Sequence, residues 1–458
     1  MAAWELAGES GLIELYASLP AAYFQKERWF ADRELAGEIE LVDSARFYEP
    51  GQADPVIALN LYRIKPFAGY YYYIPFLISR SRNREREAFF EKNGFYFYDA
   101  VSTGEYVSLV EELLRHQASY TASRGVFQFQ SFRTLSEPRL RLMGGTSNSL
   151  LFVTRAYLLK NYRRIYPGTN PELKISAALT ELGSKQIPEI YGFFNYRDQE
   201  DHTLGIVMET VENSGAGWER WGRLLRNNSP ETGELLREEA RQLGRALGYL
   251  HRDLADISRR AGGYSELDLT DIERRIDGLI GEIKADRSCF LEFDSILGKL
   301  NDFKERLTAG KLGAKFRIHG DLHLEQVVKT DTGWRILDFE GEPLKSIQER
   351  EQYDSPLKDL AALLRSISYR IQGVGTGRNR SELEEKIGSG LIEGYLGWCR
   401  EVKADFLPGP DELGFLLTLF QIERAVYECV YESKYRPDWL WIPRTGLKKL
   451  MGCDLPSL

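Results

Sequence analysis

A short polar stretch, residues 316–343, interrupts a C-terminal half whose hydrophobic periodicity otherwise predicts long helices. The predicted helices are 231–251, 268–285, 289–308, 356–371, 381–402 and 409–434. The stretch among them reads F-R-I-H-G-D-L-H-L-E-Q-V-V-K-T-D-T-G-W-R-I-L-D-F-E-G-E-P. Carboxylates, amides and imidazoles that gather in one loop between helices indicate a chemical site.

Asp321, Gln326 and Asp338 follow one another at a spacing that suits phosphoryl transfer. Protein kinases carry H-R-D-x-x-x-x-N followed by D-F-G, and this chain has Gln in place of Asn and D-F-E in place of D-F-G. We therefore expect Asp321 to orient and deprotonate an acceptor hydroxyl. Gln326 and Asp338 are expected to bind Mg²⁺ on the phosphates of ATP.

His319 and His323 lie on either side of Asp321. We expect His319 to make structural hydrogen bonds, because no Ser or Cys nucleophile motif stands near it, whereas His323 could reach a substrate. The alternative is a structural loop in which His319, Asp321 and His323 cap backbone groups. A purely structural loop would not require Asp321, Gln326 and Asp338 together, so we favour the catalytic interpretation.

A second string, H-R-D-L at 251–254, matches the kinase pattern more literally but is predicted to be structural. Ser258 stands where an amide is needed, and no D-F-G-like carboxylate follows on a strand. We expect His251 and Asp253 to be polar groups at the C-terminal end of a helix.

Residues 136–212 are predicted to form a strand-rich region that binds the nucleotide. The string G-G-T-S-N-S at 144–149 joins two predicted strands. It includes Thr146, Ser147 and Asn148, whose backbone amides and hydroxyls can approach phosphate oxygens. An ordinary hairpin turn is the alternative.

Lys160 ends the next predicted strand and is expected to pair with phosphates. The helix predicted over 171–182 places Glu172 at the edge of its buried stripe, where it could reach Lys160. Met208 and Glu209 end the last strand before N-S-G-A-G, where a hinge could offer backbone groups to adenine.

The first ninety residues are predicted to be α+β, with a helix over 4–24 and strands that begin near residue 38. The predicted subdomains are 1–90, 91–135, 136–212 and 213–458.

The segment 423–439 has side chains suited to a sugar acceptor. Carboxylates bind sugar hydroxyls and aromatic faces cover the C–H surfaces of the ring. The segment supplies Glu423, Tyr427, Glu428, Tyr431, Glu432, Arg436 and Trp439. The alternative is a helix that packs its tyrosines into a core.

Charge and hydrophobicity exclude some classes of protein. The 458 residues include 60 Lys plus Arg and 68 Asp plus Glu, a net charge of −8, which disfavours nucleic acid as the main partner. No run approaches the roughly 18 apolar residues that cross a bilayer, and the N-terminus lacks a cationic start followed by an apolar segment. We expect a cytoplasmic protein that does not enter membranes.

The strings H-G-D-L-H-L-E-Q and L-D-F-E-G-E-P resemble the maltokinases, relatives of the aminoglycoside phosphotransferases and choline kinases. The resemblance extends through L-K-N-Y-R-R-I-Y-P-G-T-N-P-E-L and Y-E-C-V-Y-E-S-K-Y-R-P-D-W-L-W-I-P, and R-W-F-A-D-R resembles that family's N-terminal cap. It implies an α+β, eukaryotic protein kinase-like bilobal fold in which 1–90 is a cap, 136–212 the N-lobe and 213–458 the C-lobe.

The resemblance also implies an activity: transfer of phosphate from ATP, with Mg²⁺, to the anomeric hydroxyl of maltose. Maltose 1-phosphate would feed α-glucan (glycogen) synthesis, and the sequence leaves open whether the protein associates with a trehalose synthase. Glu340 and Arg350, in or just after these motifs, would join the acceptor site. One departure is Lys174, at a position where the resemblance implies an acidic residue, so the ion-pair partner of Lys160 is open.

Two alternatives remain. One is a kinase of another small acceptor, such as glucosamine or an aminoglycoside, although a cationic acceptor would need a denser acidic pocket than the sequence shows. The other is an inactive kinase-like scaffold, which has no physical need for Lys160, Asp321, Gln326 and Asp338 together. The sequence does not indicate an oligomeric state.

Overall fold

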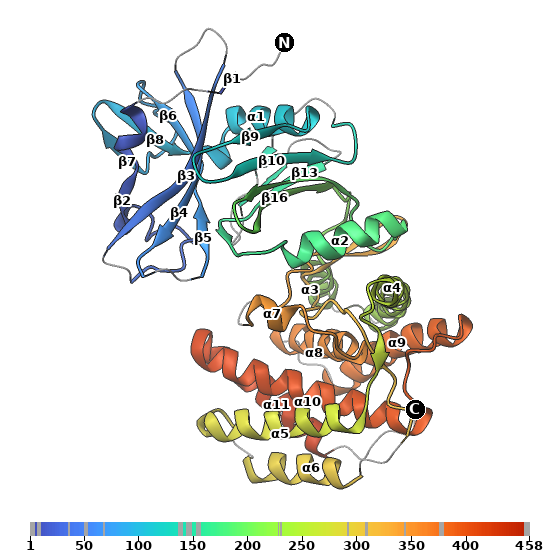
Figure 1. Ribbon diagram of the computed structural model, residues 1–458. Helices are drawn as coiled ribbons and strands as arrows, with labels where there is room; N and C mark the ends of the chain where they lie inside the picture. The colour runs from blue at the N-terminus through green and yellow to red at the C-terminus, as the bar shows by residue number, and fades with distance from the viewer. Residues whose placement is uncertain are drawn as a thin grey trace. The chain divides into compact units, whose positions relative to one another are not determined.

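The chain forms two compact units, which are described separately (Figure 1). The computed structural model describes residues 5–6, 11–34, 37–49, 54–66, 69–135, 141–142, 149–152, 157–227, 229, 231–290, 293–306, 310–342, 345–374 and 380–452. The N-terminal unit comprises Met1–Ala177 and Pro188–Glu212, and the helical unit comprises Ala178–Ile187 and Asn213–Leu458. The boundaries predicted near residues 90 and 135 stay a prediction.

An antiparallel sheet organises the first part of the N-terminal unit, with strand order β1-β3-β4-β6-β8-β7 and with β2, β5 and β14 paired at its sides. Its strands are β1 (Glu5–Leu6), β2 (Ser18–Pro20), β3 (Glu38–Tyr48), β4 (Val56–Ile64), β5 (Tyr71–Tyr73), β6 (Phe76–Ser79), β7 (Phe90–Lys92), β8 (Phe95–Asp99) and β14 (Arg164–Ile165). Successive side chains point to opposite faces, so Tyr72 belongs to one hydrophobic cluster and Tyr73 to the other. The tyrosines of β5 therefore pack on both faces of the sheet.

The helix predicted over 4–24 is wrong where the structure describes these residues. β2 pairs with β3, and the short 3-10 turns η1 (Gly11–Leu15) and η2 (Ala21–Tyr23) flank it. Pro20 has no N–H and its ring clashes with the preceding helical turn, so an α-helix cannot pass through it easily. The apolar periodicity instead reflects Tyr16 and Leu19, which are buried against the sheet.

A second antiparallel sheet of the same unit has the order β11-β12-β13-β16-β15-β10-β9. Its strands are β9 (Ser119–Thr121), β10 (Val126–Ser131), β11 (Arg141–Leu142), β12 (Ser149–Phe152), β13 (Tyr157–Asn161), β15 (Ile190–Arg197) and β16 (Asp201–Glu209). Helix α1 (Gly104–Arg115) begins where the Thr103 hydroxyl accepts the N–H of Tyr106, and it packs against β10 and β15. Helix α2 (Pro171–Leu182) follows β14 and carries Glu172 in its first turn.

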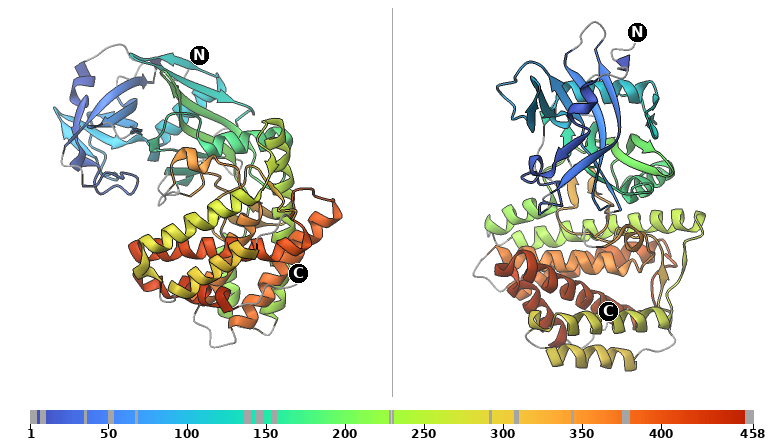
Figure 2. Two further views of the ribbon diagram at one scale, coloured as in Figure 1. Left: turned by 60° about the horizontal axis from the view of Figure 1, so that its bottom comes forward. Right: turned by 60° about the vertical axis from the view of Figure 1, so that its left-hand side comes forward.

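Helices dominate the second unit, and α8 to α11 pack on one another in the views of Figure 2. The helices are α3 (Gly217–Asn227), α4 (Thr232–Arg260), α5 (Leu269–Ala285), α6 (Phe293–Arg306), α7 (Ile347–Arg350), α8 (Leu357–Gly373), α9 (Arg380–Glu401), α10 (Pro410–Tyr435) and α11 (Trp441–Gly452). Short strand pairs join β17 (Ser265–Glu266) to β18 (Ala314–Lys315) and β19 (Val327–Thr330) to β20 (Gly333–Ile336). The α+β class predicted from the sequence is confirmed.

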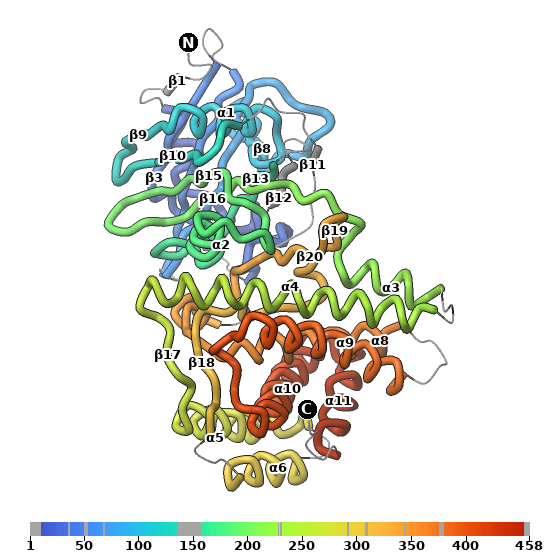
Figure 3. Tube along the Cα trace, turned by 90° about the vertical axis from the view of Figure 1, so that its right-hand side faces the viewer, coloured from blue at the N-terminus to red at the C-terminus, as the bar shows by residue number. Residues whose placement is uncertain are grey.

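Helices α4 and α9 run side by side along much of their length (Figure 3). Gly244 and Gly394 permit this close approach, because a Cβ atom at Gly244 would lie 2.1 Å from the Leu391 carbonyl oxygen and one at Gly394 would lie 1.9 Å from that of Arg241. Helix α4 continues nine residues beyond the predicted end at 251. Within the described residues, no helix combines the length and the hydrophobicity needed to cross a membrane.

Candidate active site

Asp359, in the first turn of α8, holds the backbone of the loop that precedes Asp321. Its Oδ2 accepts the N–H of His319 at 2.8 Å, and its Oδ1 accepts the N–H of Gly320 at 2.9 Å. Gly320 has a φ of +85°, a conformation that glycine adopts without strain. Because both N–H groups end on one fixed carboxylate, the position of Asp321 is set by α8.

His251 supports Asp359 from helix α4. Its Nε2 donates to Asp359 Oδ2 at 3.2 Å, and its Nδ1 accepts from the Tyr395 hydroxyl at 2.9 Å. Burial opposes ionisation of Asp359, but the hydrogen bonds from His251 and from the Gly320 N–H outweigh it and hold the pKa of this carboxyl below its usual range. The prediction that His251 is a polar group at a helix end is therefore wrong, because α4 runs on to Arg260 and buries the imidazole fully.

His319 makes structural hydrogen bonds, as predicted. Its Nε2 donates to the Leu337 carbonyl oxygen at 2.8 Å, and its Nδ1 accepts the N–H of Asp321 at 3.3 Å. One imidazole thus links the loop of Asp321 to the end of strand β20, directly before Asp338.

The hairpin β19–β20 brings Gln326 and Asp338 together, as their spacing suggested. The N–H of Leu337 donates to the Gln326 carbonyl oxygen at 2.8 Å, and Gln326 Nε2 donates to Asp338 Oδ2 at 3.0 Å. Asp338 has a φ of +66°, which is uncommon for a residue other than glycine and is found where a functional geometry requires it.

Glu340 belongs to the same cluster. One of its carboxylate oxygens lies within 4.8 Å of one from Asp338. Carboxylate and amide oxygens are the ligands that Mg²⁺ prefers, so Gln326, Asp338 and Glu340 suit this ion. Glu340 was expected at the acceptor, but it is not among the residues that line the pocket described next.

A pocket of about 370 Å³ opens beside Asp321 in the helical unit. This volume lies within the range of about 300–1,000 Å³ typical of small-molecule sites. Most of the residues predicted to bind the acceptor line it: His323, Tyr427, Glu428, Tyr431, Glu432 and Trp439. Arg436, which the sequence also predicts for the acceptor, lines it as well, whereas Trp218, Tyr369 and Arg424 line it and were not predicted from the sequence.

Arginine side chains neutralise carboxylates of this pocket. Arg424 Nη1 lies 3.1 Å from Asp321 Oδ1, Arg365 Nη2 lies 2.7 Å from Glu428 Oε2, and Arg436 Nη2 lies 2.7 Å from Glu432 Oε1. Burial raises the pKa of Glu432, and Arg436 opposes that rise. Glu325 also lines the pocket and is exposed.

Arg424 contacts carboxylates from separate segments of the helical unit. Besides Asp321, its Nη1 lies 3.2 Å from Glu342 Oε1, its Nε lies 3.7 Å from Glu428 Oε1, and its guanidinium carbon lies 5.1 Å from the centre of the Tyr427 ring. Burial alone would lower the pKa of Arg424, but these carboxylates outweigh burial and raise it. The sequence signal that could have identified Arg424 is its i,i+4 spacing from Glu428 on the predicted helix.

His323 is held in its neutral form. Burial lowers the pKa of His323 more than the nearby Asp321 carboxylate raises it, and Arg424 lowers it further. Its ordinary value of about 6.5 falls, so the imidazole is mostly uncharged near pH 7.

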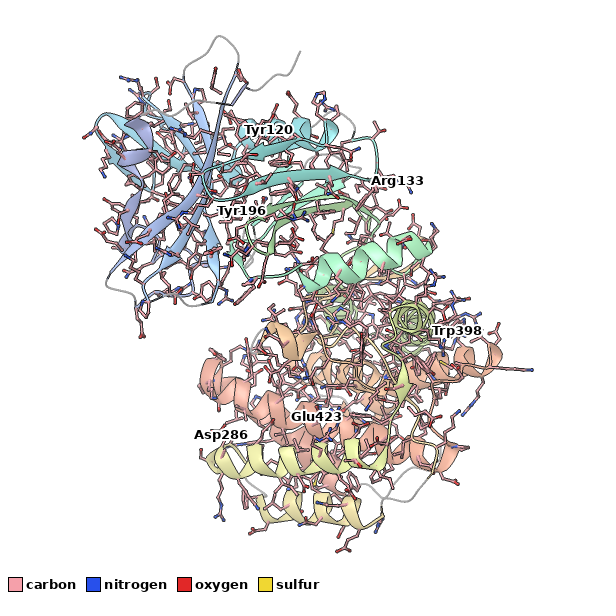
Figure 4. All side chains as sticks on the ribbon, viewed as in Figure 1. Tyr120, Arg133, Tyr196, Asp286, Trp398 and Glu423 are labelled. Carbon is pink, nitrogen blue, oxygen red and sulfur yellow. The ribbon has the colours of Figure 1, made fainter. Side chains whose placement is uncertain are left out.

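Arg350 lies elsewhere, at a second cavity of about 600 Å³ that shares Arg424 and Tyr427 with the first. A buried charge network forms part of this cavity, with Arg275 Nη1 2.6 Å from Glu423 Oε2, Lys358 Nζ 3.0 Å from Glu423 Oε1 and Lys358 Nζ 3.2 Å from Asp354 Oδ2. Figure 4 marks Glu423, on α10, among these side chains. The pocket beside Asp321 therefore does not include the predicted Arg350.

In the N-terminal unit, Lys160 on β13 pairs with Glu172 on α2. Lys160 Nζ donates to Glu172 Oε2 at 2.6 Å, and the Tyr162 hydroxyl donates to the same oxygen at 2.6 Å. Lys160 and Glu172 are both buried, whereas Lys174 is exposed. Lys160 therefore has an acidic partner, Glu172, although position 174 is a lysine.

The other residues predicted to bind the nucleotide are only partly described. Met208 and Glu209 end β16, paired in register with Leu158 and Tyr157 of β13. Thr146, Ser147 and Asn148 lie outside the described residues.

The fold is that of a known kinase structure. A crystal structure of a glucosamine kinase superposes with a TM-score of 0.71 over 96% of this chain and 99% of that chain, at 17% sequence identity. A structure of glucosamine kinase in complex with glucosamine, ADP and inorganic phosphate gives a TM-score of 0.66 over 95% of this chain and 98% of that chain, at 16% identity. The predicted eukaryotic protein kinase-like fold with additional N-terminal α+β structure is confirmed.

A curated protein that also carries the name glucosamine kinase is similar to part of the sequence. The glucosamine kinase of Streptacidiphilus jiangxiensis is 23% identical over 141 residues, which are 29% of this chain and 31% of that protein. The match therefore spans about a third of the length of this curated relative. No protein-family model matches the chain.

Proposed function

We propose that the protein is an ATP-dependent kinase that phosphorylates a hydroxyl group of a small sugar. The observation that carries this proposal is the position of Asp321, at a pocket lined by carboxylates and aromatic rings and on the same loop-and-hairpin as Gln326 and Asp338. This combination provides a base beside an acceptor pocket and a cluster of oxygen ligands for a metal-nucleotide.

Asp321 acts as the base in this proposal. Its Oδ1 is held by Arg424, and its Oδ2 makes no hydrogen bond within the part of the chain that the structure describes. Oδ2 can therefore accept the proton of an acceptor hydroxyl as that oxygen attacks the γ-phosphorus of ATP. His323, uncharged and adjacent, can hydrogen-bond the acceptor without adding a charge.

The residues predicted from the sequence to bind the nucleotide belong to this proposal as well. Lys160, held by Glu172, would neutralise phosphate charge, and Thr146, Ser147 and Asn148 would approach the phosphate oxygens, while Met208 and Glu209 would border adenine. Mg²⁺ held by Gln326, Asp338 and Glu340 would neutralise charge on the phosphates of ATP.

We further propose maltose as the acceptor, phosphorylated at its anomeric hydroxyl to maltose 1-phosphate. Tyr427, Tyr431 and Trp439 offer aromatic faces for sugar rings. Asp321, Glu428 and Glu432 already have arginine partners, which favours an uncharged sugar over an amino sugar. The proposal includes supply of α-glucan synthesis, a cytoplasmic location and association with a trehalose synthase.

Glucosamine is the second candidate acceptor. The similarity in fold to glucosamine kinase over nearly the full chain favours it. The two candidates differ in charge, so a panel of acceptors separates them directly.

The test is phosphate transfer from Mg²⁺-ATP to maltose, glucose, trehalose, glucosamine and an aminoglycoside, with Asp321→Asn alongside the wild type. Maltose turnover that falls by about 10²–10⁴ in Asp321→Asn would support both acceptor and base. Asp331→Asn, the same change at an exposed position of the β19–β20 turn, is the matched control and is expected to keep wild-type activity. Turnover of glucosamine alone would replace maltose, and no turnover of any sugar would contradict the kinase proposal.

A further inference from the structure

Arg424 lines the pocket beside Asp321 and lies between two carboxylates. Its Nη1 lies almost midway between Asp321 Oδ1 at 3.1 Å and Glu342 Oε1 at 3.2 Å. Its side chain is only 17% exposed, and Tyr427 lies against the guanidinium. One fixed positive charge therefore stands directly beside the base.

Glu428, another carboxylate of the pocket, is paired with a second arginine. Arg365, buried on α8, donates to Glu428 Oε2 through Nε at 3.1 Å and through Nη2 at 2.7 Å. Glu428 thus has a partner of its own besides the more distant Nε of Arg424. If the charge of Arg424 were removed, Asp321 and Glu342 would lose a shared cation, and the pocket would gain net negative charge next to Asp321.

Arg424 also fixes the direction of Asp321. A guanidinium presents its N–H groups in a rigid plane, so a contact at Oδ1 orients the whole carboxylate. Loss of this contact would leave the backbone of Asp321 in place, because Asp359 holds the preceding loop, but would free the side chain to rotate.

We infer that Arg424 is the specificity-determining residue of this site: it holds Asp321 in position and supplies the positive charge that makes the pocket accept uncharged sugars and reject amino sugars. This inference rests on the proposed function for its chemistry, since a sugar acceptor must enter the pocket beside Asp321. The charge of one side chain thus sets the choice of acceptor.

Two substitutions separate the charge of Arg424 from its geometry. Arg424→Gln removes the charge and is expected to shift the ratio of kcat/KM for glucosamine over maltose upward by about 10- to 100-fold, because an ammonium group then meets the Asp321 carboxylate without the competing guanidinium. Arg424→Lys keeps the charge but loses the planar fork. It is expected to retain the preference for maltose and to lower kcat more than it changes KM.

Matched controls exclude a general effect of losing an arginine. Arg237→Gln removes an arginine that pairs with Glu393 on the exposed surface of α4, and it is expected to leave both activity and acceptor ratio unchanged. Should Arg424→Gln fail to fold, as judged by thermal unfolding, Arg424→Met preserves most of the side-chain volume and tests the same loss of charge.

Acceptor binding measured by calorimetry without ATP distinguishes this inference from the proposed kinase activity. Maltose binding without phosphate transfer in the wild type, with a shift toward glucosamine in Arg424→Gln, would support the inference and contradict the kinase. An acceptor ratio that does not move in the charge-removing variant, in transfer or in binding, would overturn the inference while the kinase stands. A wild type that binds none of these sugars would overturn both.

Discussion

The imidazole of His251 and the carboxylate of Asp359 meet at 3.2 Å in the interior of the helical unit, on helices whose sequences lie more than one hundred residues apart. This pair fixes the loop before Asp321, because Asp359 also accepts the backbone N–H groups of His319 and Gly320. The position of the proposed base is thus determined by buried polar contacts.

Asp359→Ala is expected to destabilise the protein strongly. It leaves two buried N–H groups without an acceptor, and each unsatisfied group costs about 1–3 kcal/mol, so the free energy of unfolding should fall by roughly 2–6 kcal/mol. Urea unfolding measures this change. Asp405→Ala removes an exposed carboxylate that pairs with Arg259 and should cost less than about 1 kcal/mol. Equal stability of the two variants would contradict the bracing role of Asp359.

Stability at acid pH should depend on Glu423. Burial opposes its ionisation, but Arg275 and Lys358 outweigh burial and lower the pKa of Glu423 to about 2. Since the folded pKa lies below the unfolded value of about 4.3, the stabilisation is complete above that value and is lost as pH falls toward 2.

Glu423→Gln tests this pH dependence. Wild type should be the more stable protein at pH 7, and the difference in unfolding free energy should shrink between pH 5 and the lowest pH at which both proteins still fold. Glu305→Gln, an exposed position on α6, should track wild type throughout. A difference that is constant with pH would show that the network does not depress this pKa.

Lys160→Met is expected to lower kcat/KM for ATP by about 10²–10³, the usual effect of removing one charge-stabilising donor. Glu172→Gln should have a smaller effect in the same direction, since it leaves the ammonium but loosens its position. Lys174→Met makes the same change at an exposed position of α2 and should behave as wild type. Equal effects at Lys160 and Lys174 would argue against a phosphate contact for Lys160.

Asp338→Asn tests the metal cluster. The variant should need a much higher Mg²⁺ concentration for half-maximal activity, because an amide replaces the carboxylate beside Gln326 and Glu340. Titration of Mg²⁺ at saturating ATP measures this, and Asp331→Asn is again the matched control. An unchanged Mg²⁺ requirement would remove Asp338 from the proposed metal site.

Local patterns were enough to predict which loop and which helix face lie together at one pocket. The spacing of Asp321, Gln326 and Asp338 predicted their proximity because a loop followed by a two-stranded hairpin leaves few other arrangements. Helical periodicity placed Glu428 and Glu432 on one face, and both line the pocket.

Long-range contacts were not accessible from the same patterns. Arg424 lies 103 positions from Asp321 along the chain, and no local rule pairs the two. His251 lies in a string that resembles a catalytic motif, yet the imidazole is fully buried and its partner is Asp359 on α8. Pro20 and strand pairing likewise overrode an apolar periodicity that predicted a helix.

The central claim is that Asp321 activates a sugar hydroxyl toward the γ-phosphate of ATP. Phosphorus NMR of a reaction that contains Mg²⁺-ATP and maltose tests it most directly, because a phosphate ester on an anomeric oxygen is coupled to the anomeric proton. The account predicts this signal together with ADP for the wild type, and its near absence for Asp321→Asn. An equal signal from both proteins, or ADP formed only with free inorganic phosphate, would contradict it.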